Sequence, residues 1–157
     1  MKKERILYLM MGAPGSGKST WVKEQIVEKG GIHISRDAIR FSLVKENEEY
    51  FSKENLVIET FLNDIQRAID TTNEDVYVDA THISTKSRNA ILKNLWLRKI
   101  DIVEAVLIDP GLEISLERNN LRSGREKVPE QVIKSMYKNL TYPTEGEKLI
   151  NKFTIIN

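Results

Sequence analysis

The chain has 157 residues, enough for one buried core and too few for two comfortable domains, so one domain over residues 1–157 is expected. Its 24 Lys and Arg residues nearly balance 23 Asp and Glu residues, so no overall field would attract a polyanionic partner. The absence of cysteine excludes disulfides, thiolate zinc sites and thiol catalysis. The first apolar run ends at Gly12 in a glycine-rich loop, so neither a signal peptide nor a membrane span is predicted, and a cytoplasmic location is expected.

The predicted first strand, 5–11, leads directly into that loop. The loop fits the phosphate-binding pattern G-x-x-x-x-G-K-[ST] at every fixed position and consists of Gly12, Ala13, Pro14, Gly15, Ser16, Gly17, Lys18 and Ser19. A helix over 20–29 follows, and this order of strand, loop and helix is the one in which backbone N–H groups surround a phosphate. We therefore predict an ATP site, in which Lys18 contacts the β- and γ-phosphates and Ser19 ligates Mg²⁺. An ordinary glycine-rich turn is the alternative.

Strands and helices alternate along the rest of the chain. The expected strands cover 32–35, 76–80, 102–108 and 152–156, and the expected helices cover 36–44, 53–71, a segment after Ser84 or Thr85, 112–121 and 130–140. Ser52 is expected to cap the long helix, which carries Leu56 among its apolar residues, and Trp96 is placed on the apolar face of the helix after Ser84. This alternation predicts an α/β fold with one central parallel sheet and helices on both faces.

Ligands of such sheets bind beyond the carboxyl ends of the strands, so the residues that follow each strand are the most informative. Ser35 is followed by Arg36, Asp37 and, one turn later, Arg40. Arg36 and Arg40 lie four apart on one helical face, which favours clamping a phosphate over pairing with distant carboxylates. Asp37 is predicted to accept a proton from a hydroxyl nucleophile. The alternative is that Asp37 caps the helix and both arginines are solvated.

The third strand ends in Asp79, followed by Ala80, Thr81 and His82. Asp79 is predicted to ligate Mg²⁺ through water or to orient Arg36 or Arg40, and Thr81 lies next to it on the acceptor side. The alternative for Asp79 is a cap for the turn toward Ser84. His82 and His33 are not assigned to the site, since a histidine in a loop or a strand more often satisfies the local structure.

Arginines gather near the segment 122–127, which has little apolar content and is expected to form a mobile lid over about 118–128. Arg118, Arg122 and Arg125 make a local positive cluster that the balanced net charge conceals. Arginines that reach over a triphosphate neutralise the charge that develops on the transferred phosphoryl group. A solvated basic helix end is the alternative.

Three tracts, 12–21, 35–40 and 116–138, together resemble the kinase domain of bacteriophage-type 5′-hydroxyl polynucleotide kinases, and the similarity extends over about 5–140. The resemblance implies a three-layer P-loop kinase fold and a bacterial or phage-infected bacterial host. It also implies roles for individual residues: Lys18 and Ser19 hold ATP and Mg²⁺, Asp37 is the general base, Arg40 contacts the acceptor phosphate, and Asp79 lies near the acceptor. Thr20, next to the loop, and Arg118, in the lid, are also expected to bind ATP. Arg122 and Arg125 remain alternatives for the catalytic arginine of the lid.

Such phage enzymes often carry a 3′-phosphatase domain with an Asp-x-Asp-Gly-Thr motif after the kinase. This motif does not occur here, so no phosphatase domain is expected within the chain.

The predicted function is ATP-dependent phosphorylation of the 5′-hydroxyl end of DNA or RNA, with the nucleic-acid end as the partner. Few aromatic residues and a balanced charge leave open a kinase of a small hydroxyl substrate, such as a nucleoside or a sugar. A nucleotide-hydrolysing switch is a second alternative, since Asp79 would also suit the acidic position of such ATPases.

Overall fold

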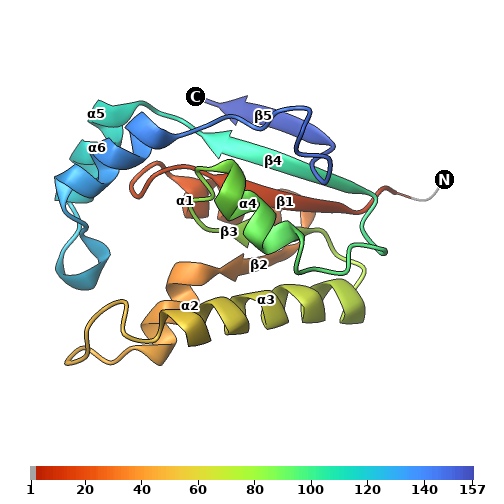
Figure 1. Cartoon of the computed structure of the whole chain (residues 1–157), viewed down its shortest axis with the longest axis horizontal. Coiled ribbons are helices and arrows are strands. Elements are labelled where there is room, and N and C mark those ends of the chain that lie inside the picture. Colours follow the sequence, from red (N-terminus) through yellow and green to blue (C-terminus); the bar gives the residue numbers. More distant parts are fainter. Residues whose placement is uncertain (1–2) are drawn as a thin grey trace.

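Five strands form a central sheet in the computed structural model, which describes residues 3–157 (Figure 1). Their order across the sheet is β2-β3-β1-β4-β5, and every neighbouring pair is parallel. The strands are β1 (Ile6–Met11), β2 (Ile32–Ser35), β3 (Val76–Asp79), β4 (Ile102–Ile108) and β5 (Lys152–Ile156). The predicted parallel α/β sheet is confirmed, and all five carboxyl ends point to the same edge.

Helices cover both faces of the sheet, and the sequence of β1 shows why. Alternate side chains of a strand point to opposite faces, so a strand buried on both sides is apolar throughout. Leu7 and Leu9 pack beneath α3 (Glu54–Thr71) and α4 (Thr85–Leu92), whereas Tyr8 and Met10 pack against α1 (Lys18–Lys29). The protein therefore has three layers, with α1 on one face and α3 and α4 on the other (Figure 1).

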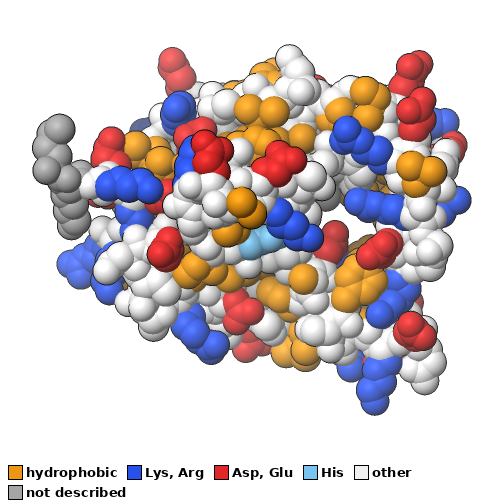
Figure 2. Space-filling model, turned by 180° about the vertical axis from the view of Figure 1, so that it is seen from behind, with side chains coloured by type: hydrophobic (Ala, Val, Ile, Leu, Met, Phe, Trp, Pro, Cys, Tyr) orange, Lys and Arg blue, Asp and Glu red, His pale blue; other side chains and the backbone are white. Residues whose placement is uncertain are grey.

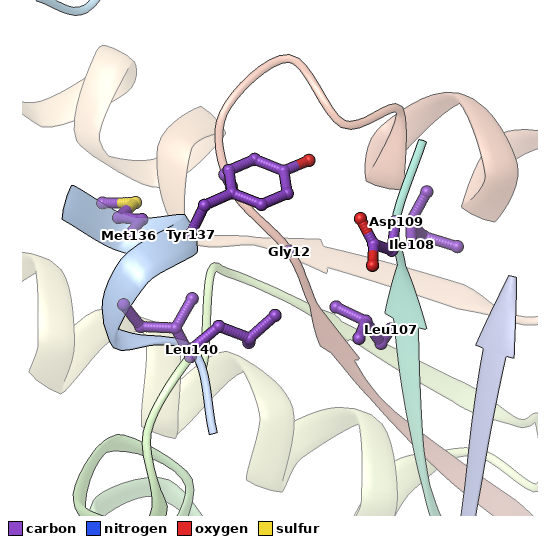
Figure 3. Close-up of a pocket in the computed structure, with 9 residues that line it drawn as sticks. Gly12, Leu107, Ile108, Asp109, Met136, Tyr137 and Leu140 are labelled. Carbon is purple, nitrogen blue, oxygen red and sulfur yellow. The ribbon is translucent and has the colours of Figure 1, made fainter. Parts of the chain in front are cut away.

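Three shorter helices stand at the carboxyl edge, where they can form a site. Helix α2 (Arg36–Leu43) follows β2, and α5 (Leu112–Asn120) and α6 (Glu130–Asn139) follow β4. The hydroxyl of Tyr137 lies 2.7 Å from Ser115 Oγ and 3.2 Å from the Gly111 carbonyl, which ties α6 to α5. The side chains of Met136, Tyr137 and Leu140 close over Gly12 and the end of β4, leaving a void of only about 10 Å³ (Figure 3). This void is packing space and not a ligand site, because it holds at most one water molecule.

A buried ion pair fixes the segment before β5. Arg88 on α4 and Glu147 are both inaccessible, and Arg88 Nε lies 2.8 Å from Glu147 Oε1. Arg88 Nη2 also donates to Glu147 Oε2, and Nη1 donates to the His82 carbonyl, so each guanidinium nitrogen has a hydrogen-bond partner. Because breaking one partner of such a pair leaves a buried charge, α4 and the C-terminal segment are held together firmly.

Two sequence predictions about the helices, the Ser52 cap and the placement of Trp96 on α4, are wrong, and one apolar residue of α3 is exposed. Ser52 does not cap α3, because the helix begins at Glu54 after Lys53, which makes no side-chain cap bond. Leu56 is 47% exposed, and its neighbour Val57 is the buried residue. Trp96 lies beyond the end of α4 and is 78% exposed, since Gln66 bonds to the Trp96 backbone and leaves the indole outside. Within residues 3–157, no helix is long and apolar enough to cross a membrane.

Candidate active site

The phosphate-binding loop joins β1 to α1 at the carboxyl edge of the sheet. Gly15 has φ +81°, and a Cβ atom built there would lie 2.6 Å from the Ser115 carbonyl oxygen. A Cβ atom at Gly12 would lie 2.9 Å from the Ile108 carbonyl oxygen. Glycine is required at both positions, because the loop must turn in left-handed conformations while touching α5 and β4.

Several unpaired donors face the space enclosed by this loop. Helix α1 begins at Lys18 with Gly17 as its cap residue, without a side-chain cap bond or an acidic residue in its first turn. Its first N–H groups therefore remain free for an anion, which the helix dipole also favours. Ser16 Oγ is buried and has no hydrogen-bond partner among the described residues. These features fit a bound phosphate group.

The ammonium of Lys18 lies folded over the loop, where Nζ donates to the Gly12 carbonyl at 2.8 Å and the Ala13 carbonyl at 3.2 Å. Burial lowers the pKa of Lys18, and the negative charges of Asp79 and Asp37 oppose this shift. An ammonium that is desolvated in this way gains from a triphosphate, which supplies the missing negative charge. The geometry agrees with the predicted role of Lys18 in ATP binding.

Asp79 joins three elements at the end of β3. Its Oδ2 accepts a hydrogen bond from Ser19 Oγ at 2.7 Å and lies 2.8 Å from His33 Nε2. Burial would raise the pKa of Asp79, but the bonds from His33 and Ser19 and the charge of Lys18 hold it below its usual range. The carboxylate therefore stays ionised beside the phosphate-binding loop.

Two expectations about this group change with the structure. Asp79 neither orients Arg36 or Arg40 nor caps the turn toward Ser84, since its bonds go to Ser19 and His33, and Ser84 caps α4 by itself. His33 was left out of the site because it lies within a strand, yet it contacts Asp79. Its neighbour in the register, Tyr77, is two residues before Asp79, so the parallel pairing of β2 with β3 is the signal that places the imidazole there.

The oxygens of Ser19 and Asp79 suit Mg²⁺, which prefers hard oxygen ligands and retains water and phosphate in its shell. Within residues 3–157, no cluster of three or more His, Cys, Asp or Glu side chains is arranged to hold a metal. Mg²⁺ bound with a nucleotide needs only one or two protein oxygens, so Ser19 with Asp79 behind it fits the predicted metal site.

On the other side of the edge, α2 presents Asp37. The alternative in which Asp37 caps α2 is wrong, because Ser35 is the cap and its Oγ accepts from the Ala38 N–H at 3.2 Å. The Asp37 side chain is 72% exposed, and its Oδ1 lies 2.6 Å from Arg40 Nη1. Asp37 is thus held by one contact while most of the carboxylate remains open for another group.

Arg40 is not the free phosphate clamp that the sequence predicted. It is 5% exposed, and its Nε and Nη2 donate to Glu54 at 2.8–3.0 Å while Nη1 donates to Asp37. Glu54 begins α3 and was not identified from the sequence. Its distance of 14 residues from Arg40 gives no local signal, and only the packing of α2 on α3 brings the two together.

Arg36 is better placed than Arg40 to meet an anion. Its Nη2 is 3.7 Å from Glu54 Oε2, while its Nε is buried and has no hydrogen-bond partner among the described residues. A buried guanidinium N–H without a partner is costly, and a phosphate oxygen would satisfy it.

A cavity of about 480 Å³ connects these groups. Its wall includes Lys18, Ser19 and Asp79 on one side and Arg36, Asp37 and Arg40 on the other. Thr81 also lines it, and the Thr81 carbonyl accepts from the Gly12 N–H at 2.9 Å. Seen from behind, the molecule is hollowed, with basic, acidic and apolar side chains around the opening (Figure 2).

The lid segment 118–128 lies across the cavity from α2. Asn119 is buried, and its amide both donates to the Val128 carbonyl at 2.7 Å and accepts from the Val128 N–H at 3.0 Å. This clamp closes the loop, which contains one turn of 3₁₀ helix, Gly124–Glu126. Arg118 Nη1 donates to the Ser16 carbonyl at 2.9 Å, so its guanidinium lies on the phosphate-binding loop.

The two remaining lid arginines differ in their contacts. Arg125 Nη1 donates to the Val44 carbonyl at 2.5 Å, and its guanidinium lies 4.9 Å from the ring centre of Phe41. Arg122 lines the cavity, is exposed, and makes only a 3.4 Å bond to the Glu126 carbonyl. Arg125 therefore holds the lid against α2, whereas Arg122 faces the cavity. Thr20 is exposed in the first turn of α1 and does not line the cavity.

His82 is not among the residues that line the cavity. It is buried, and its Nδ1–H donates to the Met10 carbonyl at 2.7 Å. Burial lowers the pKa of His82 to about 4, so the imidazole is neutral near pH 7. Its role is to support the end of β1 beneath the phosphate-binding loop.

A family model described as an AAA domain matches residues 7–143, so the chain belongs to this family of phosphate-binding-loop proteins. Within the family, it is a kinase-type domain that resembles polynucleotide kinases. A protein of Acanthamoeba polyphaga mimivirus, named as a candidate bifunctional polynucleotide phosphatase/kinase, is 32% identical over 123 residues. These residues are 77% of this chain and 24% of that protein, so the chain spans about a quarter of its relative. The resemblance predicted from the sequence is confirmed.

Solved structures confirm the predicted P-loop kinase fold. A chain of the Pnkp1/Rnl/Hen1 RNA repair complex superposes with a TM-score of 0.73 at 20% identity, covering 89% of this chain and 45% of that one. A gluconokinase from Sinorhizobium meliloti 1021 superposes with a TM-score of 0.62 at 19% identity, covering 99% and 86%. At such identities the likeness shows the fold alone.

Proposed function

We propose that the protein transfers the γ-phosphate of ATP to the 5′-hydroxyl at the end of a nucleic acid. One observation carries this proposal: the phosphate-binding loop and the exposed Asp37 carboxylate line the same cavity, together with Arg36 and Arg122. A donor site, a proton acceptor and unpaired positive charge are the parts that phosphoryl transfer to an alcohol requires.

On the donor side, the loop N–H groups and Lys18 would bind the phosphates, and Arg118 would close over them. Mg²⁺ held by Ser19, with Asp79 behind it, would neutralise charge on the β- and γ-phosphates. Arg122, which has the weakest contacts of the lid arginines, would stabilise the charge that develops on the transferred group.

On the acceptor side, Asp37 would take the proton from the attacking hydroxyl. Arg40 is the positioning residue for Asp37, since its Nη1 holds Oδ1 at 2.6 Å and Glu54 holds the rest of its guanidinium. Arg36 would contact the phosphate on the 3′ side of the acceptor nucleotide, because its Nε is buried and unpartnered. Arg40 has at most one N–H left for this contact.

A kinase for a small sugar-like acceptor is the second candidate, because a gluconokinase has the same fold over 99% of this chain. The two candidates share the donor site and differ in whether a phosphate on the acceptor is recognised. The mimivirus relative, whose name includes polynucleotide kinase activity, supports the first candidate.

Transfer of labelled γ-phosphate to a nucleoside and to its 3′-monophosphate tests the proposal. We expect the 3′-monophosphate to be the better acceptor by at least about tenfold in kcat/KM, the size of one charge-assisted hydrogen bond. Equal use of both acceptors would show that no backbone phosphate is recognised and would favour the small-molecule candidate.

A further inference from the structure

Aromatic side chains line the acceptor wall of the cavity. Phe41 belongs to α2, and Tyr50 and Phe51 belong to the loop between α2 and α3. The ring of Tyr50 lies edge-on to both others, with centroid distances of 5.7 Å to Phe41 and 4.9 Å to Phe51. Edge-to-face packing at these distances stabilises the group and fixes the orientation of each ring.

Phe51 differs from its two neighbours in its exposure. It is 59% exposed, whereas Phe41 and Tyr50 are half-buried, and the Arg125 guanidinium already covers Phe41. The cavity therefore contains one large apolar ring that is held in place and still in contact with solvent. Burying that surface against a flat ligand would be favourable.

Arg40 places this ring close to the predicted proton acceptor. Its guanidinium carbon lies 5.2 Å from the Phe51 ring centre and 5.1 Å from that of Tyr50, while its Nη1 holds Asp37. Asp37 and Phe51 therefore contact the same guanidinium, which is fixed by Glu54. In a nucleotide, only the sugar ring separates the 5′ oxygen from the base, so a hydroxyl at Asp37 would bring its own base toward Phe51.

We propose that Phe51, supported by Tyr50 and Arg40, is a stacking surface for the nucleobase of the acceptor's terminal nucleotide. This inference rests on the proposed function and adds the specificity that separates nucleic-acid ends from sugars, which have no flat aromatic face. Stacking on an aromatic ring tolerates all bases, so the surface selects a base without selecting its identity.

Two 5′-hydroxyl oligonucleotides that differ only in the terminal residue, one with a base and one abasic, test the proposal. We expect the wild-type protein to favour the base-bearing end by at least about fivefold in kcat/KM. Phe51→Ala should lose at least this factor on the base-bearing end and change little on the abasic end, while Phe51→Trp should retain activity. Trp96→Ala removes an even more exposed ring that does not line the cavity and should affect neither acceptor.

Equal loss on both acceptors in Phe51→Ala would assign Phe51 to folding of the loop and overturn the stacking proposal. Lack of discrimination by the wild-type protein would overturn it too, while leaving the kinase function intact. Failure to phosphorylate either oligonucleotide would refute both proposals.

A binding measurement without chemistry is the second readout. An oligonucleotide with 2-aminopurine at its 5′ end should lose fluorescence on binding wild-type protein and lose less with Phe51→Ala. An unchanged signal on saturation of the wild-type protein would overturn stacking.

Discussion

The donor and acceptor sides of the cavity are built in different ways. The donor side is the phosphate-binding loop between β1 and α1, together with Ser19 on α1 and His33 on β2, which both contact Asp79 at the end of β3. The acceptor side consists of one short helix and two loops that α3 and the lid hold together through ion pairs and arginine–aromatic contacts. In the proposed function, the sheet would position ATP, and less regular segments would contact the acceptor.

This difference predicts that a change on the donor side abolishes transfer to every acceptor. Lys18→Ala should lower kcat at least a hundredfold, which is about 3 kcal/mol of barrier, because an ammonium at the transferred phosphate is lost. Lys29→Ala, at the exposed end of the same helix, is the control. Near-normal transfer by folded Lys18→Ala would contradict the assignment of the donor site.

On the acceptor side, Asp37→Asn keeps the shape of the side chain but removes its basicity. We expect kcat to fall about a hundredfold while ATP affinity stays nearly unchanged, as for loss of a general base. Asp70→Asn, on the outer part of α3, is the control. If kcat of Asp37→Asn is unchanged, Asp37 only pairs with Arg40.

Substitution of the two arginines of α2 should affect different properties, namely stability for Arg40 and acceptor binding for Arg36. Arg40→Ala should lower the free energy of unfolding by about 2 kcal/mol, because it leaves the half-buried Glu54 without its main partner. Arg36→Ala should raise KM for 3′-phosphorylated acceptors about tenfold with little effect on the free energy of unfolding. Thermal unfolding and steady-state kinetics measure the two effects. The opposite pattern would return the phosphate contact to Arg40.

A smaller effect concerns His82, which lies beneath the phosphate-binding loop and should make the stability of the protein depend on pH. Burial lowers the pKa of His82 from its ordinary value of 6.5 to about 4. At pH values below 6.5, His82 is therefore protonated to a greater extent in the unfolded chain than in the folded chain. The free energy of unfolding should therefore fall by about 1.5 kcal/mol between pH 6.5 and pH 5 from this group. Chemical denaturation at a series of pH values, compared with His82→Asn, measures it. A titration of the His82 imidazole near pH 6.5 in the folded protein would contradict the prediction.

How far the site could be predicted depends on how local its contacts are. The strand boundaries, the phosphate-binding loop and the position of Asp37 follow from short patterns, and the structure agrees with them. Glu54, His33 and the aromatic wall could not be found in this way, because they meet the site only through the α2–α3 packing, the β2–β3 register and a loop of irregular structure. The exposure of Trp96 was missed for the same reason, since α4 ends at Leu92 and the distant Gln66 bonds to the Trp96 backbone beyond it.

The central claim is that the acceptor is the 5′-hydroxyl end of a nucleic acid, and direct competition between two acceptors tests it. A 5′-hydroxyl oligonucleotide and gluconate are offered together, at equal concentration, with limiting labelled ATP and Mg²⁺, and both products are quantified. We predict that the label passes predominantly to the 5′ end of the oligonucleotide, and that Lys18→Ala abolishes this transfer. Preferential labelling of gluconate by the wild-type protein would contradict the account and assign the protein to the small-molecule kinases.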